Sequence, residues 1–351
     1  MEIKRKNYTV KVSEPELYVD NQSRGRSGHM THAMVEFAPG KILDFNSNCS
    51  AVIYEGHSAF GWVEYRISED GGNTFSEPRD FPYSKQKFYD GTNTVSVEKA
   101  VVCNDGRIVA FCLRNNLREL AEPWDTPMVV MSFDGGETWT EAKEFSPYRG
   151  RIYDALYHNG VIYVIEFCND ATVSFFGNKE EHVYRLYTSC DNGDTFEELC
   201  VVPTDTMGRS YASLLFDANG CLHLYTYNEK NEHNPDHLIS EDNGKTWEHA
   251  GVCHLAKGSR NPQTAVIDGV YVLHCRAEEI NRNKLVLYTS TDAVTWDEGT
   301  FIDETAYGTC FYSNNLLLRD EKGKEKLLLQ YSHSYLEKRV NIRHMWLEIE
   351  R

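Results

Sequence analysis

The sequence predicts an all-β fold, a six-bladed β-propeller whose outer turns are built on a recurrent Asp residue. Three observations predict it: a turn octapeptide that occurs five times, six apolar hairpins that alternate with it, and no linker that would divide the 351 residues. A propeller blade is a four-stranded antiparallel sheet. One apolar hairpin and one hairpin bearing the octapeptide would supply those four strands. The 21 Tyr and 16 Phe suit such strands, which favour aromatic side chains.

The recurrent octapeptide, which we call the Asp box, reads Ser-x-Asp-x-Gly-x-Thr-aromatic. Complete copies begin at Ser68, Ser132, Ser189 and Ser240, and a fifth copy at residues 290–296 is one residue shorter and lacks the Gly. In such a turn the Asp carboxylate accepts N–H groups of its own loop, Gly supplies a positive φ, and the hydroxyls cap their neighbours. Because a self-satisfied turn needs no ligand, we interpret the boxes as structural and expect them on the outer rim of the blades.

Six apolar hairpins alternate with the boxes, and we interpret them as the two inner strands of six blades. They span residues 33–45, 100–113, 153–167, 212–225, 263–274 and 314–330. Most turn at Asn-Gly or Asp-Gly, the strongest short-range hairpin signal. The sixth blade has no box, and its last strands fall at residues 340–350. The strand at residues 8–12 is predicted to pair with this blade and so remove an exposed edge. The whole chain, 1–351, is interpreted as one domain.

Composition and charge argue against several classes of protein. The formal net charge of −17 argues against nucleic acid and against an anionic membrane surface, since both attract basic patches. We recognise no signal peptide and no transmembrane segment, and the ten Cys fall singly without a CxxC pair. Buried reduced thiols and a cytoplasmic location are therefore expected, or secretion if a leader has been removed. No metal-ligand spacing or dinucleotide fingerprint is present, so no cofactor is expected.

Arginine residues concentrate at one end of the predicted inner strands. The start of the first inner strand and the end of the second meet at the same face of every blade. The arginines at or near those positions are Arg26, Arg114, Arg151, Arg209, Arg260 and Arg276. A guanidinium fork suits a carboxylate, so the group favours an anionic ligand. The alternative is that these arginines form salt bridges with acids at the same face, such as Glu98 and Glu166.

The boxes and the six-blade spacing resemble the sialidase (neuraminidase) superfamily over nearly the whole chain. Sialidases of this type are exo-glycosidases that hold the substrate carboxylate with three Arg and use a Tyr nucleophile assisted by a Glu, with an Asp as acid/base. A neutral phenol avoids the repulsion that the sugar's own carboxylate would exert on an anionic nucleophile. The resemblance implies a retaining exo-α-sialidase that acts on a sialylated or other acidic glycan.

Individual residues match the family pattern in part. Glu98 and Arg114 resemble its Glu-plus-Arg strand pair, although they fall in blade two where blade four is expected. Tyr312 resembles the nucleophile and Arg282 the third Arg, each in the expected blade. For the acid/base, the family spacing indicates the loop after the first inner hairpin. The carboxylates there are Glu55 and Glu64, and Glu55 is our choice.

The family's Arg-Ile-Pro signature is absent from blade one, and an Arg-x-Pro instead opens blade five at Arg260. Taking blade five as the first blade would make Tyr211 the nucleophile. We favour Tyr312, because rotation of a whole active site around a propeller is the larger assumption.

Two further functions stay open. A lyase or hydrolase of uronic-acid glycans would use the arginines for a uronate, with His29, His32 or His57 and a Tyr as acid and base. The missing Arg-Ile-Pro favours it. A non-catalytic glycan-binding propeller is the third possibility, since fold does not dictate chemistry. The Glu and Tyr retained at the ligand face weigh against it.

Overall fold

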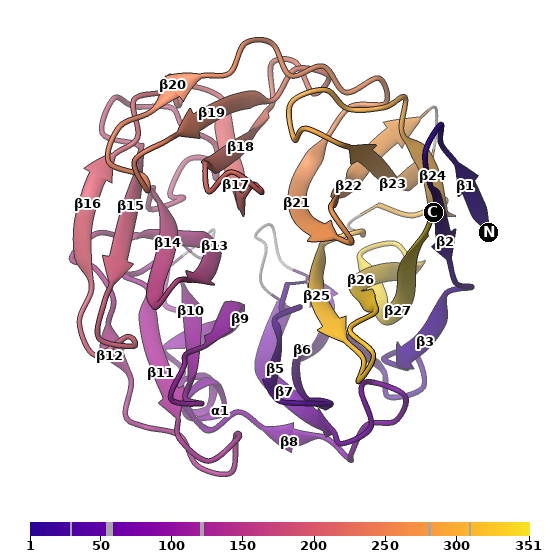
Figure 1. The fold of residues 1–351 in the computed structure, drawn as a ribbon. Coiled ribbons are helices and arrows are strands. Elements are labelled where there is room, and N and C mark those ends of the chain that lie inside the picture. Colours follow the sequence, from indigo (N-terminus) through magenta and orange to yellow (C-terminus); the bar gives the residue numbers. More distant parts are fainter. Residues whose placement is uncertain (29, 54–58, 120–122, 280–281, 309) are drawn as a thin grey trace. The chain divides into compact units, whose positions relative to one another are not determined.

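The structure is a computed structural model that describes residues 1–28, 30–53, 59–119, 123–279, 282–308 and 310–351. The chain forms two compact units. Unit 1 comprises Met1–His29, Tyr211–Asn243 and Glu248–Arg351, and unit 2 comprises Met30–Ser210 and Gly244–Trp247. In the described residues the strands form six sheets, labelled in Figure 1 and here called blades one to six in chain order.

Unit 2 contains blades one to three. Their strands follow chain order across each sheet. Blade one consists of β5 (Met34–Ala38), β6 (Lys41–Ile53), β7 (Ala59–Ser68) and β8 (Arg79–Asp80), and blade two of β9 (Asn93–Val102), β10 (Ile108–Asn116), β11 (Met128–Ser132) and β12 (Lys143–Glu144). Blade three consists of β13 (Gly150–His158), β14 (Val161–Cys168), β15 (Val183–Ser189) and β16 (Glu197–Val201).

Unit 1 contains blades four to six, apart from the first two residues of blade four, Arg209 and Ser210, which belong to unit 2. Blade four consists of β17 (Arg209–Phe216), β18 (Leu222–Asn228), β19 (Asp236–Ser240) and β20 (Glu248–His249), and blade five of β21 (Arg260–Ile267), β22 (Val270–Glu279), β23 (Arg282–Ser290) and β24 (Thr300–Thr305). Blade six has the order β1 (Glu2–Lys4), β2 (Thr9–Val12), β27 (Arg339–Glu350), β26 (Glu325–Leu336) and β25 (Ser313–Arg319), and β3 (Glu16–Val19) also pairs with β27. The short β4 (Arg26–Ser27) lies beside β27, because Ser27 Oγ accepts a hydrogen bond from the Val340 amide at 3.1 Å.

The six predicted inner hairpins are all present, and the turn residues explain two of them directly. Asn159 and Gly160 have φ of 50° and 84°, and Asp268 and Gly269 have φ of 47° and 71°. Positive φ at both central residues defines a type I′ turn, whose twist matches that of the flanking strands. Asn, Asp and Gly are the residues that adopt this conformation with least strain.

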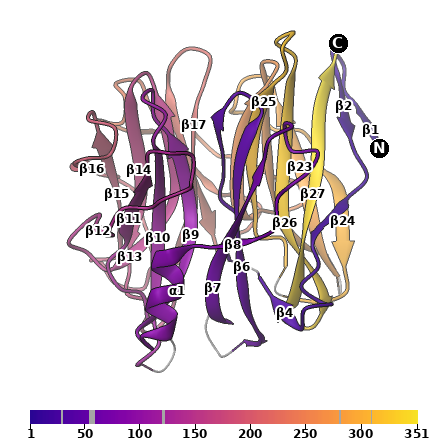
Figure 2. The same cartoon turned by 90° about the horizontal axis from the view of Figure 1, so that it is seen from below.

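Blade six is completed by strands from both ends of the chain. β2 runs antiparallel to β27, with Thr9 opposite Glu350 and Val12 opposite Leu347. Figures 1 and 2 both show β1 and β2 beside the strand that carries the C-terminus. The outermost strand, β1, has only three residues, and a short edge strand offers little backbone to another chain.

Each Asp box joins the third and fourth strands of its blade, and its Asp carboxylate closes the turn as predicted. Asp70 accepts hydrogen bonds from the Thr74 amide at 2.9 Å, the Thr74 hydroxyl at 2.7 Å and the Ser68 hydroxyl at 2.8 Å. In the shortened fifth box, Asp292 accepts from the Thr295 amide at 2.7 Å. Ala293 there has a left-handed φ of 58°, in the region that glycine adopts in the complete copies.

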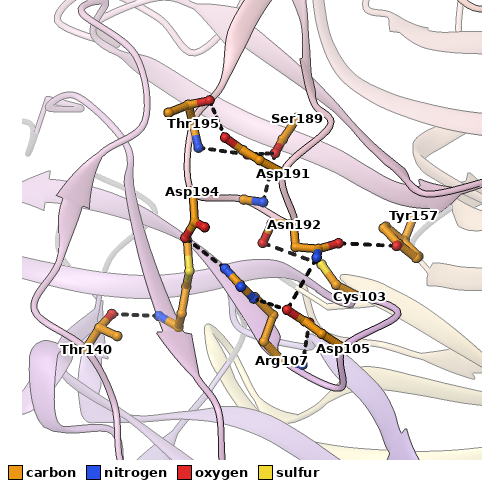
Figure 3. A network of polar contacts seen from close by, with 12 residues as sticks. Cys103, Asp105, Arg107, Thr140, Tyr157, Ser189, Asp191, Asn192, Asp194 and Thr195 are labelled. Carbon is orange, nitrogen blue, oxygen red and sulfur yellow. Dashed lines mark hydrogen bonds and ion pairs between the residues drawn. The ribbon is translucent and has the colours of Figure 1, made fainter.

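The boxes also bind the preceding blade, which the sequence did not predict. Tyr65 of β7 donates a hydrogen bond to the Gly136 carbonyl in the box of blade two at 2.7 Å. Figure 3 shows the next contact of this kind, where Arg107 beside the blade-two hairpin turn pairs with Asp194 of the blade-three box at 2.8 Å. Tyr225 of β18 similarly donates to the Ala293 carbonyl. A box therefore both closes its own turn and fixes it to a neighbouring sheet.

The helix α1 (Pro82–Tyr89) was not predicted, because eight residues are too few to show a helical period. Pro82 occupies the first helical turn, where its missing N–H leaves no hydrogen bond unmade. Ser84 ties the helix to two strands: its hydroxyl accepts from the Val63 amide at 3.0 Å and donates to the Val95 carbonyl at 3.1 Å. Figure 2 shows α1 beside β9 and β10.

The cysteines agree with the prediction of reduced thiols. All ten are free, and seven are buried, whereas Cys190 is exposed and Cys200 and Cys221 are partly buried. In the part of the chain that the structure describes, no helix has the length and apolar character needed to cross a membrane.

Candidate functional site

The structure distributes the candidate residues over both units. Unit 1 holds Tyr211, Arg260, Arg276 and Tyr312, and unit 2 holds Glu98, Arg114 and Arg209. Arg282 begins β23 in unit 1, and its backbone pairs with Glu279. Glu55, His29 and His57 lie outside the described residues.

Arg260 and Arg276 lie directly opposite each other in the β21–β22 ladder of blade five. The register shifts between Arg260 and Gln263, so the strand carries a bulge immediately after Arg260. Like charges at directly opposite positions destabilise a sheet. Each guanidinium therefore needs other partners, and the groups that contact it differ between the two arginines.

Arg276 is a buried cation without a carboxylate partner in the described residues. Only 9% of the residue is exposed, and its Cζ lies 5.6 Å from the centre of the Tyr312 ring. Nη1 donates to the Cys310 carbonyl at 3.5 Å, while Nε is buried and has no hydrogen-bond partner among the residues that the structure describes. A buried charge is costly unless it is paired, so an anion bound here would relieve that cost.

Arg260 is held by a glutamate that the sequence did not indicate. Its Nε lies 3.4 Å from Glu232 Oε1, and its Cζ lies 5.6 Å from the Tyr227 ring centre. Tyr227 is fully buried and donates its O–H to the same Glu232 oxygen at 2.7 Å. Burial first, and then the hydrogen bond to Glu232, raise the pKa of Tyr227 above its usual value. Its phenol therefore stays protonated and acts as a donor.

Tyr211 connects the two arginine environments. Its ring centre lies 6.2 Å from those of both Tyr227 and Tyr312. Tyr211 is 6% exposed and Tyr312 is 8% exposed, whereas Tyr227 has no exposed surface. We call the set Tyr211, Tyr227, Glu232, Arg260, Arg276 and Tyr312 the arginine–tyrosine cluster. Tyr211 and Tyr312 are therefore the tyrosines of the cluster that keep a small exposed area.

The backbone is strained beside this cluster. Asn261, which follows Arg260, has φ of 55°, and Phe311, which precedes Tyr312, has φ of 56°. A positive φ is unusual for any residue with a side chain and more so for a bulky one. The Asn261 side chain is also 4% exposed, with no hydrogen-bond partner for its oxygen or nitrogen among the described residues. Such strain collects at functional sites, where the surrounding structure enforces it.

Glu98 of unit 2 already has an arginine partner. Its Oε2 lies 2.8 Å from Arg151 Nε and 2.6 Å from Arg151 Nη2, and both side chains are nearly inaccessible. Burial raises the pKa of Glu98 in spite of the opposing effect of Arg151. The salt-bridge alternative therefore holds for Glu98 and Arg151, and the assisting role of Glu98 in catalysis stays a prediction.

Arg114 and Arg209, the other two candidate arginines of unit 2, donate hydrogen bonds to backbone carbonyls. Arg114 Nε donates to the Thr126 carbonyl at 2.7 Å, and no carboxylate of the described residues pairs with it. Arg209 Nη1 donates to the Met207 carbonyl at 3.0 Å. Arg114 thus resembles Arg276 in lacking a carboxylate partner.

Glu166 does not form, within the described residues, the salt bridge that the alternative interpretation of the arginines included. The residue is fully buried on β14, and neither carboxylate oxygen has a hydrogen-bond partner in the described part of the chain. Arg185, directly opposite on β15, instead holds Glu198 with both oxygens at 2.8 Å. Burial raises the pKa of Glu166 to about 8, so its carboxyl group is largely protonated at neutral pH.

Sequence reasoning missed Glu232 because it lies in a polar loop beyond β18, four residues past the end of that strand. No spacing in the sequence connects it to Arg260. Within the described ranges, no three His, Cys, Asp or Glu side chains are grouped in a way that could hold a metal ion.

A comparison with known protein families identifies the family of this chain. Residues 13–324 match the family described as the BNR repeat-like domain. The chain belongs to this BNR repeat-like family. A search of curated proteins found no match.

Solved structures similar to this BNR repeat-like chain share little sequence with it. A protein of unknown function from Dyadobacter fermentans is 17% identical, with 97% of this chain and 99% of that chain covered and a TM-score of 0.70. A Hadza microbial sialidase is 15% identical, with coverages of 95% and 68% and a TM-score of 0.72. Trypanosoma rangeli sialidase, bound to 2,3-difluorosialic acid as a covalent intermediate, is 15% identical, with coverages of 99% and 58% and a TM-score of 0.61. The chain thus spans little more than half of that last protein. At these identities the likeness shows the fold, and it confirms the predicted six-bladed β-propeller class.

Proposed function

We propose that this protein is a glycoside hydrolase that releases a terminal acidic sugar, as a retaining exo-α-sialidase. The observation that carries the proposal is Arg276, a buried guanidinium with no carboxylate partner in the described residues. Two buried tyrosines that keep a small exposed area, Tyr211 and Tyr312, accompany it. A sugar carboxylate would supply the missing anion, and a phenol beside it is a nucleophile that the carboxylate does not repel.

The comparisons support this proposal at the level of family and fold. BNR repeat-like membership covers most of the chain, and two of the similar structures are described as sialidases. The complex of one of them is described as a covalent intermediate with difluorosialic acid. A covalent intermediate is what a double-displacement mechanism requires.

In the proposed reaction Arg276 holds the sugar carboxylate, and the oxygen of Tyr312 attacks the anomeric carbon. The bond to the leaving oxygen breaks as an acid gives that oxygen a proton, while the phenol proton passes to a carboxylate base. Water then attacks the anomeric carbon and gives one proton to the deprotonated acid. The bond from that carbon to the Tyr312 oxygen breaks as the base returns its proton to the phenol, and the sugar leaves with its original anomeric configuration. The resemblance nominates Glu55 as the acid and Glu98 as the base, and both assignments stay predictions.

The proposal is tested with a fluorogenic α-sialoside assayed beside the matching β-glucuronide. Wild type should cleave the sialoside, and Tyr312→Phe should lower turnover by several orders of magnitude with little change in binding, because it removes a group that acts in the chemical step. A 2,3-difluorosialic acid should label Tyr312, which mass spectrometry would locate. Full activity in both Tyr312→Phe and Tyr211→Phe would reject the phenol mechanism.

A hydrolase or lyase of uronic-acid glycans is the second candidate. The unpaired charge of Arg276 suits any sugar carboxylate, and the sequence lacks the Arg-Ile-Pro that sialidases carry in blade one. Cleavage of uronate-containing glycans with no cleavage of sialosides would select this candidate. A product with the absorbance of an unsaturated uronate would identify a lyase.

A further inference from the structure

Unit 1 contains two triads of the same chemistry, in which a buried Tyr donates to a carboxylate that also holds an Arg. In the first, Tyr227 donates to Glu232 at 2.7 Å and Arg260 lies 3.4 Å from the same oxygen. In the second, Tyr331 donates to Asp303 at 2.7 Å and Arg343 lies 3.0 Å from the same oxygen. Both phenols are fully buried. Each triad contains one carboxylate and one guanidinium and so balances its own charge.

The two triads differ in the charge of the basic residue next to them. Arg260 lies directly opposite Arg276, which has no carboxylate partner in the described residues. The neighbour of the second triad is His333, whose Nε2 lies 3.8 Å from Asp303 and whose pKa burial lowers, so that it is neutral near pH 7. The arginine–tyrosine cluster therefore holds one net positive charge, and the Asp303 triad holds none.

We propose that Glu232 makes the arginine–tyrosine cluster selective for a singly charged carboxylate and against doubly charged groups such as a phosphate monoester. This inference rests on the proposed function, in which the cluster binds the acidic group of the sugar. One carboxylate compensates Arg276. The second charge of a dianion would find Arg260 already neutralised and would face Glu232.

The physical basis is the strength of charge repulsion at a partly buried site, where the side chains of Arg260 and Glu232 are 23% and 29% exposed. Two like charges a few ångströms apart repel more strongly in such a site than in bulk water. Tyr227 keeps the repelling carboxylate in place, because its O–H is bound to the oxygen that also faces Arg260. Selectivity would thus come from a fixed negative charge beside a positive site. This charge repels a dianion, whereas attractive contacts alone would not exclude it.

The experiment is isothermal titration of the full chain at pH 8.0 with three probes. N-acetylneuraminate and D-glucuronate carry one charge, and glucose 6-phosphate carries two at this pH. Wild type should bind at least one carboxylate more tightly than the phosphate. Glu232→Gln keeps the size of the side chain and an acceptor for Tyr227, and it should shift the affinity ratio toward the phosphate by about tenfold or more.

Asp303→Asn is the matched control, because it removes the same charge from the equivalent triad and should leave the ratio unchanged. Tyr227→Phe keeps the charge of Glu232 but frees its carboxylate from the phenol, so it should shift the affinity ratio toward the phosphate by less than Glu232→Gln does. The ratio of carboxylate to phosphate affinity in wild type is a test that requires no variant. Phosphate binding equal to or tighter than carboxylate binding overturns the inference, although the cluster would still be an anion site. An unchanged ratio in folded Glu232→Gln, or an equal shift in Asp303→Asn, also overturns it. Wild type that binds none of the probes rejects the proposed function, and this inference with it.

Discussion

Asp134 and Glu166 are carboxylates of unit 2 that lie at opposite ends of their blades and in opposite environments. Asp134 belongs to an Asp box and accepts hydrogen bonds from Thr138 Oγ1 at 2.6 Å and the Thr138 amide at 2.9 Å. These bonds lower its pKa to about 2. Glu166 lies near the far end of β14 with no hydrogen-bond partner in the described residues, and burial raises its pKa to about 8.

Blade five shows the same contrast in unit 1. Its box carboxylate, Asp292, is bound by its own turn, whereas the buried Nε of Arg276, at the other end of the blade, has no hydrogen-bond partner in the described part of the chain. A polar group whose hydrogen bonds are made within its own turn needs no further partner. A polar group that the fold leaves unsatisfied indicates a ligand, a proton or a water. The difference predicts that box variants lose stability, and that variants at the other end lose binding or change their pH dependence.

The largest expected effect is that of Arg276→Met. The variant removes the cation but keeps an apolar side chain against Tyr312. It should lower kcat/KM for an acidic substrate roughly 30- to several-thousand-fold, which corresponds to a loss of about 2–5 kcal/mol of transition-state stabilisation. Steady-state kinetics measures it. Arg343→Met, which breaks the ion pair with Asp303, should leave kcat/KM near that of wild type. If both variants lose activity equally, the distinction between the two arginines is wrong.

Glu166→Gln should change the pH dependence of stability. An acid whose pKa rises on folding stabilises the native state fully below its unfolded value near 4.5, and this stability is lost as the pH rises toward about 8. The shift corresponds to roughly 3–5 kcal/mol lost across that window. Urea unfolding at a series of pH values should show this loss in wild type and not in Glu166→Gln. Glu197→Gln, an exposed change on β16, should keep the wild-type slope.

Ser132→Ala should test the box end of a blade. The buried Ser132 hydroxyl accepts from the Gly136 amide at 2.8 Å and donates to Asp134 at the same distance, so its loss leaves a buried N–H unsatisfied. We expect the free energy of unfolding to fall by about 1–3 kcal/mol with turnover per folded molecule unchanged. Glu141→Ala, at an exposed position in the following loop, is the control for stability. Lost turnover in folded Ser132→Ala would contradict a purely structural role.

The smallest effect is expected from Tyr65→Phe, which removes one contact between a box and the preceding blade. The Tyr65 O–H donates to the buried Gly136 carbonyl at 2.7 Å. Its loss should lower the free energy of unfolding by roughly 0.5–1.5 kcal/mol, as measured by chemical denaturation, and leave kinetics unchanged. No change in stability would show that the boxes do not stabilise the packing of one blade on the next.

The fold could be predicted from the sequence because its signals are local. A box contains the donors and acceptors of its own turn, and an Asn-Gly or Asp-Gly pair specifies its own hairpin. The cluster could be predicted only in part, because its contacts join distant segments: Glu232 reaches Arg260 from a loop after β18, and Tyr211 meets Tyr312 although a hundred residues separate them. Arg276 was predicted from its place at a strand end, but only the structure shows that Arg260 is neutralised and Arg276 is not.

The pairing of β2 with β27 has a consequence for how the protein is made. β2 leaves the ribosome early and its partner β27 late, so at about 5–20 residues per second the strand waits on the order of tens of seconds with an open edge. During that time Val10 and Val12, both buried in the finished sheet, have no core to join. The sixth blade is therefore the last to assemble, and a nascent chain stalled before residue 339 would expose the edge that the complete fold removes. A chaperone that binds short apolar strands would have its clearest opportunity there.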